Sequence, residues 1–174
     1  NEKDIVNNLK VKLQHRMLAK GYLQKDRQME LKDKILIHAE LNTVWKNLND
    51  EQTLKQCIPG CSELKGNPTD GFSATVTQKI GPVKATFRGN VTISDIIDKK
   101  NYTIKGEGKG GAAGFAKGEA KVELSQTHNG TEISYEVQAK VGGKIAQLGG
   151  RLINGFAKNL AKTFFENFKK RLEL

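Results

Sequence analysis

Two hydrophobic periodicities divide most of this chain, and together they constrain its fold. From Glu63 to Val141, apolar and polar residues alternate in successive stretches that end at turn signals such as Gly81-Pro82 and His128-Asn129-Gly130. Alternation with a period of two over several hairpins predicts an antiparallel sheet with one covered face and one face in water. From Ile145 to Leu172, apolar residues recur every three or four positions, which predicts a single helix of almost thirty residues.

This C-terminal helix is expected to cover the apolar face of the sheet. The fold class is therefore α+β, a curved antiparallel sheet wrapped around one long helix. The inward positions of the strands are rich in Ala and Gly. Small residues opposite a helix fit either close packing or a cavity, and the pattern alone leaves both open. The stripe of the helix consists of Ile145, Leu148, Leu152, Phe156, Leu160, Phe164, Phe168 and Leu172.

The segment before the alternating region adds one strand and two short helices. Leu31 to His38 alternates and predicts the first strand. Asn42 is the predicted cap of a short helix, and a second short helix is predicted from Asp50 to about Gln56. Pro59-Gly60 marks the turn that leads into the sheet.

Residues 1–28 differ from the rest, and we assign them as a basic amphipathic N-terminal extension of a main domain at 29–174. Helical spacing of apolar residues predicts a helix there, with Gly21 as its stop. We expect a surface helix docked on the domain, and the alternative is a helix that binds a membrane surface or a partner. The apolar positions are Ile5, Val6, Leu9, Leu13 and Met17, and the basic ones are Lys10, Lys12, Arg16 and Lys20.

The charge balance allows several classes of partner. A net charge of +10 attracts nucleic acid, an anionic membrane surface or an acidic protein. Single-strand binders interleave aromatic side chains with a basic groove, but aromatic residues make up only 6% here and most occupy predicted buried positions. No RRM, KH or zinc-finger signature is present, so no nucleic acid is expected. A basic polyanion-binding module remains an alternative from charge alone.

The location of the protein is expected to be cytoplasmic. No stretch approaches 18 consecutive apolar residues, so no transmembrane helix is predicted. Two cysteines, Cys57 and Cys61, are too few for a disulfide framework, and a reducing compartment is the simplest interpretation.

No catalytic or metal-binding pattern is convincing, and the protein is predicted not to be an enzyme. Gly106 to Gly111 matches the dinucleotide-binding spacing, but strand periodicity follows it where a helix is required, so we expect a bend or bulge. The three histidines are scattered, and no metal site is expected. Glu107 and Glu119 flank the glycines and are the carboxylates nearest a cavity mouth, although solvated charges are the favoured interpretation.

Four segments in order resemble the family of the carbon monoxide dehydrogenase G subunit. They are Cys57–Cys61, Lys79–Ala85, Gly106–Gly118 and Val141–Gly149. The resemblance runs from about Met29 to Phe168, roughly four-fifths of the chain. It implies a START-like helix-grip fold with an internal apolar cavity.

The resemblance also implies a function. Members of this family are accessory proteins of a carbon monoxide dehydrogenase-type molybdenum hydroxylase and carry none of its redox centres. The expected ligand is quinone-like or another apolar lipid, with no tightly bound cofactor. The expected role includes recruiting the enzyme to the membrane, which would place the protein peripherally on the inner face of the cell membrane. Family members often carry an apolar anchoring tail after the helix. No such tail follows Leu174 here, so either the tail lies outside this sequence or membrane contact is electrostatic.

The candidate site residues are those that the periodic patterns assign to the covered face of the sheet and to the helix side that faces it. A shift of one residue would turn a strand over, so each position depends on the assigned phase. A general apolar-ligand carrier with no dehydrogenase partner remains the main alternative. Candidates for docking to an anionic membrane or to the enzyme are Lys144, Arg151, Lys158 and Lys162. Candidates for lining the ligand site are Ile58, Pro59, Val76, Ile80, Phe87, Ile104, Phe115, Val137, Leu148, Leu152 and Phe156.

Overall fold

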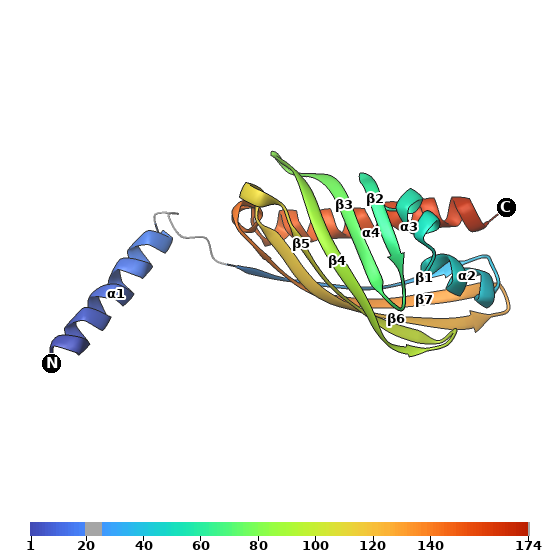
Figure 1. The fold of residues 1–174 in the computed structure, drawn as a ribbon, viewed down its shortest axis with the longest axis horizontal. Helices are drawn as coiled ribbons and strands as arrows, with labels where there is room; N and C mark the ends of the chain where they lie inside the picture. Colours follow the sequence, from blue (N-terminus) through green and yellow to red (C-terminus); the bar gives the residue numbers. More distant parts are fainter. Residues whose placement is uncertain (20–25, 174) are drawn as a thin grey trace.

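The computed structural model describes residues 1–19 and 26–173 (Figure 1). Within these two ranges, four α-helices and two short 3₁₀ helices accompany a single sheet. The helices are α1 (Glu2–Ala19), α2 (Leu41–Leu48), α3 (Glu51–Cys57), η1 (Gly111–Ala113), η2 (Lys144–Leu148) and α4 (Gly150–Leu172). The strands are β1 (Arg27–Ile37), β2 (Cys61–Asn67), β3 (Gly71–Ile80), β4 (Val83–Ile97), β5 (Asn101–Lys109), β6 (Phe115–Thr127) and β7 (Gly130–Gly142).

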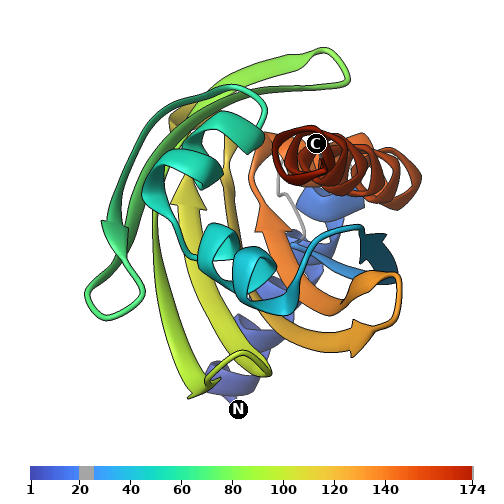
Figure 2. The same cartoon turned by 90° about the vertical axis from the view of Figure 1, so that its right-hand side faces the viewer.

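The seven strands form one antiparallel sheet in the order β1-β7-β6-β5-β4-β3-β2. The helix α4 packs against β1 and also contacts β3, near the opposite edge. Figure 2 shows the consequence: the sheet curls, α4 lies along its open side, and α2 and α3 lie at one end. The predicted α+β architecture, a curved sheet around a C-terminal helix, is confirmed.

Cross-strand register explains the alternation seen in the sequence. Leu31, Val137, Ala120, Ile104 and Ile93 are successive partners across five strands, so their side chains share one face, here called the inner face. The residues next to them in sequence, with many lysines and glutamates, share the opposite or outer face. The inner face is the one toward α4.

Buried apolar residues form two separate cores under α4. The first core lies at the α2–α3 end and contains Ile37, Val44, Leu48, Cys57, Tyr102, Val122, Leu124, Ile133, Phe165 and Phe168. The second core lies at the η2 end and contains Ile80, Ala113, Val141, Ile145, Ala146 and Ile153. The buried residues of α4 are divided between the two cores, with Ile153 in the second and Phe165 and Phe168 in the first.

The C-terminal helix is shorter than the periodicity predicted. Gly149 has φ +90° and ψ 152°, a backbone conformation open almost only to glycine, so it separates the 3₁₀ turn η2 from α4. Helix α4 begins only at Gly150. Near its start Ile153 is buried, whereas Leu152, which belongs to the predicted stripe, is 39% exposed. The prediction of an unbroken helix from Ile145 was therefore wrong.

Other element boundaries also differ from expectation. Helix α2 begins at Leu41 with Glu40 at its N-cap, so Asn42 is not the cap. Gly106 and Gly108 lie within β5, and the chain turns only after Lys109, through η1. The expected bend in the glycine run is therefore displaced toward its end.

Helix α1 does not dock on the domain. The apolar side chains of Ile5, Leu9 and Leu13 are each about 60% exposed, which corrects the expectation of a covered stripe. Figure 1 shows α1 standing apart from the sheet. The predicted stop at Gly21 and the basic Lys20 lie outside the described residues. Met29, the predicted domain boundary, lies inside β1.

Candidate functional site

A half-buried strip of apolar residues crosses the inner face between the two cores. On β1, Leu31 lies between Met29, which packs on the second core, and Ile35, which packs on the first. On α4, Leu160 lies in the same way between Phe156 and Phe164. Neither Leu31 nor Leu160 belongs to a core. We call this strip the inner band, and its members are Leu31, Val91, Ala120, Val137 and Leu160.

Several predicted lining residues lie on or beside the inner band. Val137 belongs to it, and Val76 is a half-buried residue of β3 that also lies outside both cores. Ile104 packs against the first core. Ile80 belongs to the second core, and Phe87, Leu148 and Phe156 pack against that core. The structure therefore gathers these predicted positions, from the strands, η2 and α4, between the inner face of the sheet and α4.

The loop after α3 is fastened to β3 beside this face. The Gln78 side chain donates a hydrogen bond from Nε2 to the carbonyl oxygen of Pro59 at 2.6 Å. Gly60 follows with φ +74°, and a Cβ there would collide with the carbonyl oxygen of Thr77. This attachment places the predicted residues Ile58 and Pro59, both half-buried, next to β3.

Two predicted lining residues lie elsewhere. Phe115 is the cross-strand partner of Gly142 and Lys109, which puts it on the outer face, with its ring over Gly142. Leu152 lies beside Gly81 at the β3–β4 turn and remains 39% exposed. These two residues do not join the inner set.

Polar groups also lie on the inner face, and sequence reasoning did not select them. Gln78 occupies an inner position between Val76 and Ile80, so the alternation itself marks it as a polar residue among apolar ones. Tyr135 lies two residues from Val137 on the same face. Burial, and then the negative charge of Asp33, raise the pKa of Tyr135, which keeps its hydroxyl a hydrogen-bond donor.

Two large hollows lie on the outer face. The first, here called the outer groove, has a volume of about 790 Å³ and crosses β4, β5, β6, β7 and β1. The second, of about 770 Å³, lies on the same sheet nearer the first core. The charged side chains lining the outer groove are Arg88, Lys105, Glu107, Lys109, Lys117, Glu119 and Lys140. Glu107 and Glu119 thus lie on the face opposite the inner band.

The predicted docking residues are exposed. Lys144 lies on η2, and the other three lie on α4. Lys158 and Lys162 lie seven and eleven residues after Arg151, so each projects within about 20° of Arg151 around the helix axis. They form a basic row along α4.

Some kinds of site are not found in the part of the chain that the structure describes. No group of three or more His, Cys, Asp or Glu side chains is arranged to hold a metal ion among residues 1–19 and 26–173. None of the helices described there is both long and apolar enough to cross a bilayer.

The sequence profile of the CoxG family, the G subunit of carbon monoxide dehydrogenase, matches residues 34–173. The chain belongs to this family. The resemblance seen in the four sequence segments is thereby confirmed. No curated protein matches the chain at a significant level.

Solved structures share the helix-grip fold of this CoxG family member. A conserved protein from Geobacillus kaustophilus is 30% identical, with a TM-score of 0.72 over 87% of this chain and 95% of that one. A protein from Rhizobium leguminosarum, 14% identical, has a TM-score of 0.66 over 87% of this chain and 98% of its own. A START superfamily protein from Mycobacterium smegmatis, 13% identical, has a TM-score of 0.59 over 83% of this chain and 97% of its own. The last two show the fold alone.

Proposed function

We propose that this CoxG family member is a non-catalytic accessory protein that binds a quinone-like apolar ligand on its inner band. The observation that carries the proposal is the strip of half-buried apolar residues between two closed cores. Apolar area left partly in water gains about 25 cal/mol for each Å² that a ligand removes from solvent. A flexible apolar tail lying between α4 and the sheet would cover this strip. Family membership and the START-like fold support the same type of ligand.

Polar groups at the inner face suit the head of such a ligand. A quinone presents two carbonyl oxygens, which accept hydrogen bonds. The protonated hydroxyl of Tyr135 is a donor on β7, and Gln78 offers an amide on β3. Apolar sites generally orient a ligand with a few polar groups of this kind.

A binding measurement with decylubiquinone tests the proposal. We expect Val137→Trp to fill the inner band and to weaken binding at least tenfold, as measured by equilibrium dialysis. The matched control is Gln138→Trp, the neighbouring residue on the outer face, which should bind the quinone as the wild type does. Equal binding by all three proteins would refute the proposed site. Thermal unfolding of each variant separates loss of the site from loss of the fold.

We further propose that the basic row on α4 contributes to membrane recruitment of a partner enzyme of the carbon monoxide dehydrogenase type. Exposed cations near an anionic bilayer contribute about 1 kcal/mol each. Lys158→Glu with Lys162→Glu is therefore expected to reduce flotation with phosphatidylglycerol vesicles. Unchanged flotation of this double variant would remove the row from the proposal.

A further inference from the structure

One corner of the outer face concentrates unpaired positive charge. Lys79 and Lys84 are direct cross-strand partners on β3 and β4, and Arg88 and Lys109 are direct partners on β4 and β5. All four are exposed. Across the described ranges of the chain, none of the four has a carboxylate within ion-pair distance. We call these four residues the basic corner.

This arrangement is unfavourable for the sheet itself. Like charges placed directly opposite each other on neighbouring strands destabilise the pairing, and opposite charges stabilise it. The second outer hollow follows the favourable rule, because Glu136 lies opposite Lys121 on one side and Lys32 on the other. The basic corner breaks this rule at two successive strand pairs. A bound anion would relieve the repulsion at both.

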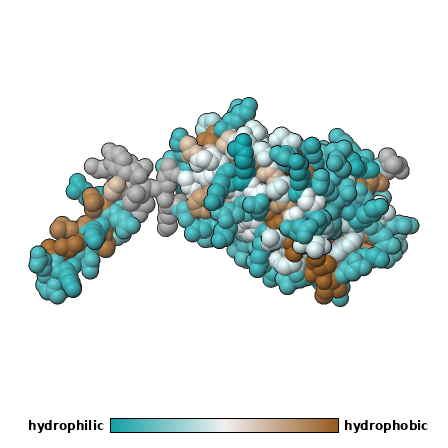
Figure 3. Space-filling model, in the orientation of Figure 1, coloured by the Kyte–Doolittle hydropathy of each residue, from teal (hydrophilic) through white to brown (hydrophobic). Residues whose placement is uncertain are grey.

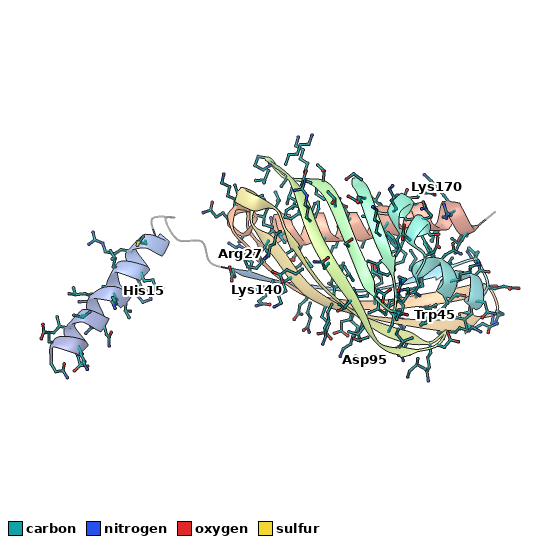
Figure 4. The ribbon with its side chains drawn as sticks, viewed as in Figure 1. His15, Arg27, Trp45, Asp95, Lys140 and Lys170 are labelled. Atoms are coloured by element: carbon teal, nitrogen blue, oxygen red, sulfur yellow. The ribbon has the colours of Figure 1, made fainter. Side chains whose placement is uncertain are left out.

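The basic corner leads into the outer groove. Arg88 and Lys109 belong to both, since they line the hollow of about 790 Å³. The β3–β4 turn and η1 lie at the same end of the sheet (Figure 1). In Figure 4, Lys140 marks the side of the groove next to β1, where its Nζ lies 3.0 Å from a carboxylate oxygen of Asp26.

The floor of the outer groove has mixed charge. Lys105 lies opposite Glu119, and Glu107 lies opposite Lys117. Side-chain amides line the groove as well, from Gln28, Asn90 and Gln138. Carboxylates within the groove would repel the evenly spaced phosphates of a nucleic acid. Amides can instead pair with the N–H and C=O groups of a polypeptide backbone.

We propose that the basic corner and the outer groove bind an acidic segment of a partner protein. Acidic side chains would meet the two cation pairs, and the backbone of the segment would follow the polar groove. This inference goes beyond the proposed function, because the groove lies on the face of the sheet opposite the inner band. A partner can therefore dock without covering the apolar ligand site.

Fluorescence anisotropy with fluorescein-labelled hexaglutamate tests the proposal on the full chain. We expect Lys84→Glu with Arg88→Glu to weaken binding about tenfold or more, because exposed charge pairs contribute a few tenths to 1 kcal/mol each and two are reversed. The matched control, Lys99→Glu with Lys100→Glu in the β4–β5 turn, makes the same change in net charge and should retain binding. Raising salt from about 0.05 to about 0.5 M should weaken the wild-type complex.

Three results would overturn the proposal. They are an equal loss in both double variants, no measurable binding by the wild type, and tighter binding of a single-stranded oligothymidylate that is lost with the same corner residues. The fold of the corner variant is checked by its thermal midpoint, which should not fall, since Lys84→Glu places opposite charges at the pair with Lys79. Decylubiquinone binding by the corner variant should be unchanged. A protein that binds hexaglutamate but no quinone would contradict the proposed function only.

Discussion

Gln78 and Pro59 join the loop after α3 to the inner face of the sheet through one hydrogen bond of 2.6 Å. The bond runs from a side chain of β3 to a backbone carbonyl 19 residues earlier in the chain. It satisfies the amide of a polar residue that would otherwise interrupt the apolar inner face. The same bond holds two of the predicted lining residues, Ile58 and Pro59, next to β3.

Removal of this bond is expected to lower stability. Gln78→Ala leaves the carbonyl of Pro59 without its partner, and a typical net cost is about 1 kcal/mol of unfolding free energy. The measurement is urea denaturation followed by circular dichroism. Gln126→Ala, at an exposed position of β6, is the control and should change stability by less than half as much. Equal effects of the two substitutions would show that the bond contributes nothing.

Asp50 is expected to stabilise the start of α3 in a pH-dependent way. Its carboxylate accepts hydrogen bonds from the backbone N–H of Thr53 at 3.0 Å and from the Thr53 hydroxyl at 2.9 Å. The backbone bond first, and the hydroxyl bond second, lower the pKa of Asp50 below its ordinary value of 3.8. The contribution to stability is therefore complete above the ordinary pKa and is lost as pH falls through the lowered one.

Asp50→Ala should cost about 1 kcal/mol at neutral pH, as N-cap replacements do. As pH falls below the lowered pKa of Asp50, the variant and the wild type should approach equal stability, because the carboxyl is then protonated in both states of the wild type. Urea denaturation at pH 7 and at a series of lower pH values measures the difference. The control Asp98→Ala, in the β4–β5 turn, should show no such convergence. A constant difference across this pH range would contradict the role of ionised Asp50.

The alternation in the sequence was sufficient to predict the strands, because the face of each side chain depends only on the local pleat. The alternation from Val83 to Ile93 predicts that its apolar residues share one face, and the register with β3 and β5 confirms this. Phe115 does not lie on the inner face as predicted, and the alternation itself explains why. Ala116 and Gly118 point inward, so the same alternation puts Phe115 on the outer face. Its assignment to the site rested also on its place in a family motif.

The break at Gly149 and the inner band could not be read from local pattern. The apolar spacing continues through Gly149 and Gly150, and only the φ angle of +90° at Gly149 shows that the helix starts anew. The exposure of Leu31 and Leu160 depends on how α4 crosses the curved sheet and where the two cores end. Such long-range geometry leaves no periodic signal in the sequence.

Gly149, the N-cap of α4, and Gly155, inside the helix, test the break between η2 and α4. Gly155 lies inside the helix, and a Cβ there would meet no atom within 4 Å. Gly155→Ala should therefore stabilise the protein by about 0.5–1 kcal/mol, because alanine loses less backbone entropy in a helix. Gly149→Ala should destabilise it by about 1–3 kcal/mol, since φ +90° is strained for alanine. Thermal unfolding of both variants gives the two signs, and a gain from Gly149→Ala would contradict the break.

The two Ile residues at the β4–β5 hairpin are a further surface feature. Ile96 and Ile97 are 48% and 54% exposed, and the hairpin that carries them lies where Figure 3 shows an apolar projection at the lower right of the domain. Ile96→Ser with Ile97→Ser should leave the free energy of unfolding within about 0.5 kcal/mol of the wild type, since little apolar area is buried there. A loss above about 2 kcal/mol in urea denaturation would show that the hairpin is covered in solution.

Deletion of residues 1–25 is expected to leave the domain intact. Helix α1 exposes Ile5, Leu9 and Leu13 by about 60% each, so it buries little apolar area against the sheet. The shortened chain keeps all of β1, which begins at Arg27 and pairs with β7 along its whole length. We expect the free energy of unfolding to change by less than about 0.5 kcal/mol, as for surface changes in general. A loss of several kcal/mol would mean that α1 packs on the domain, and the exposed stripe would then not be available to any other partner.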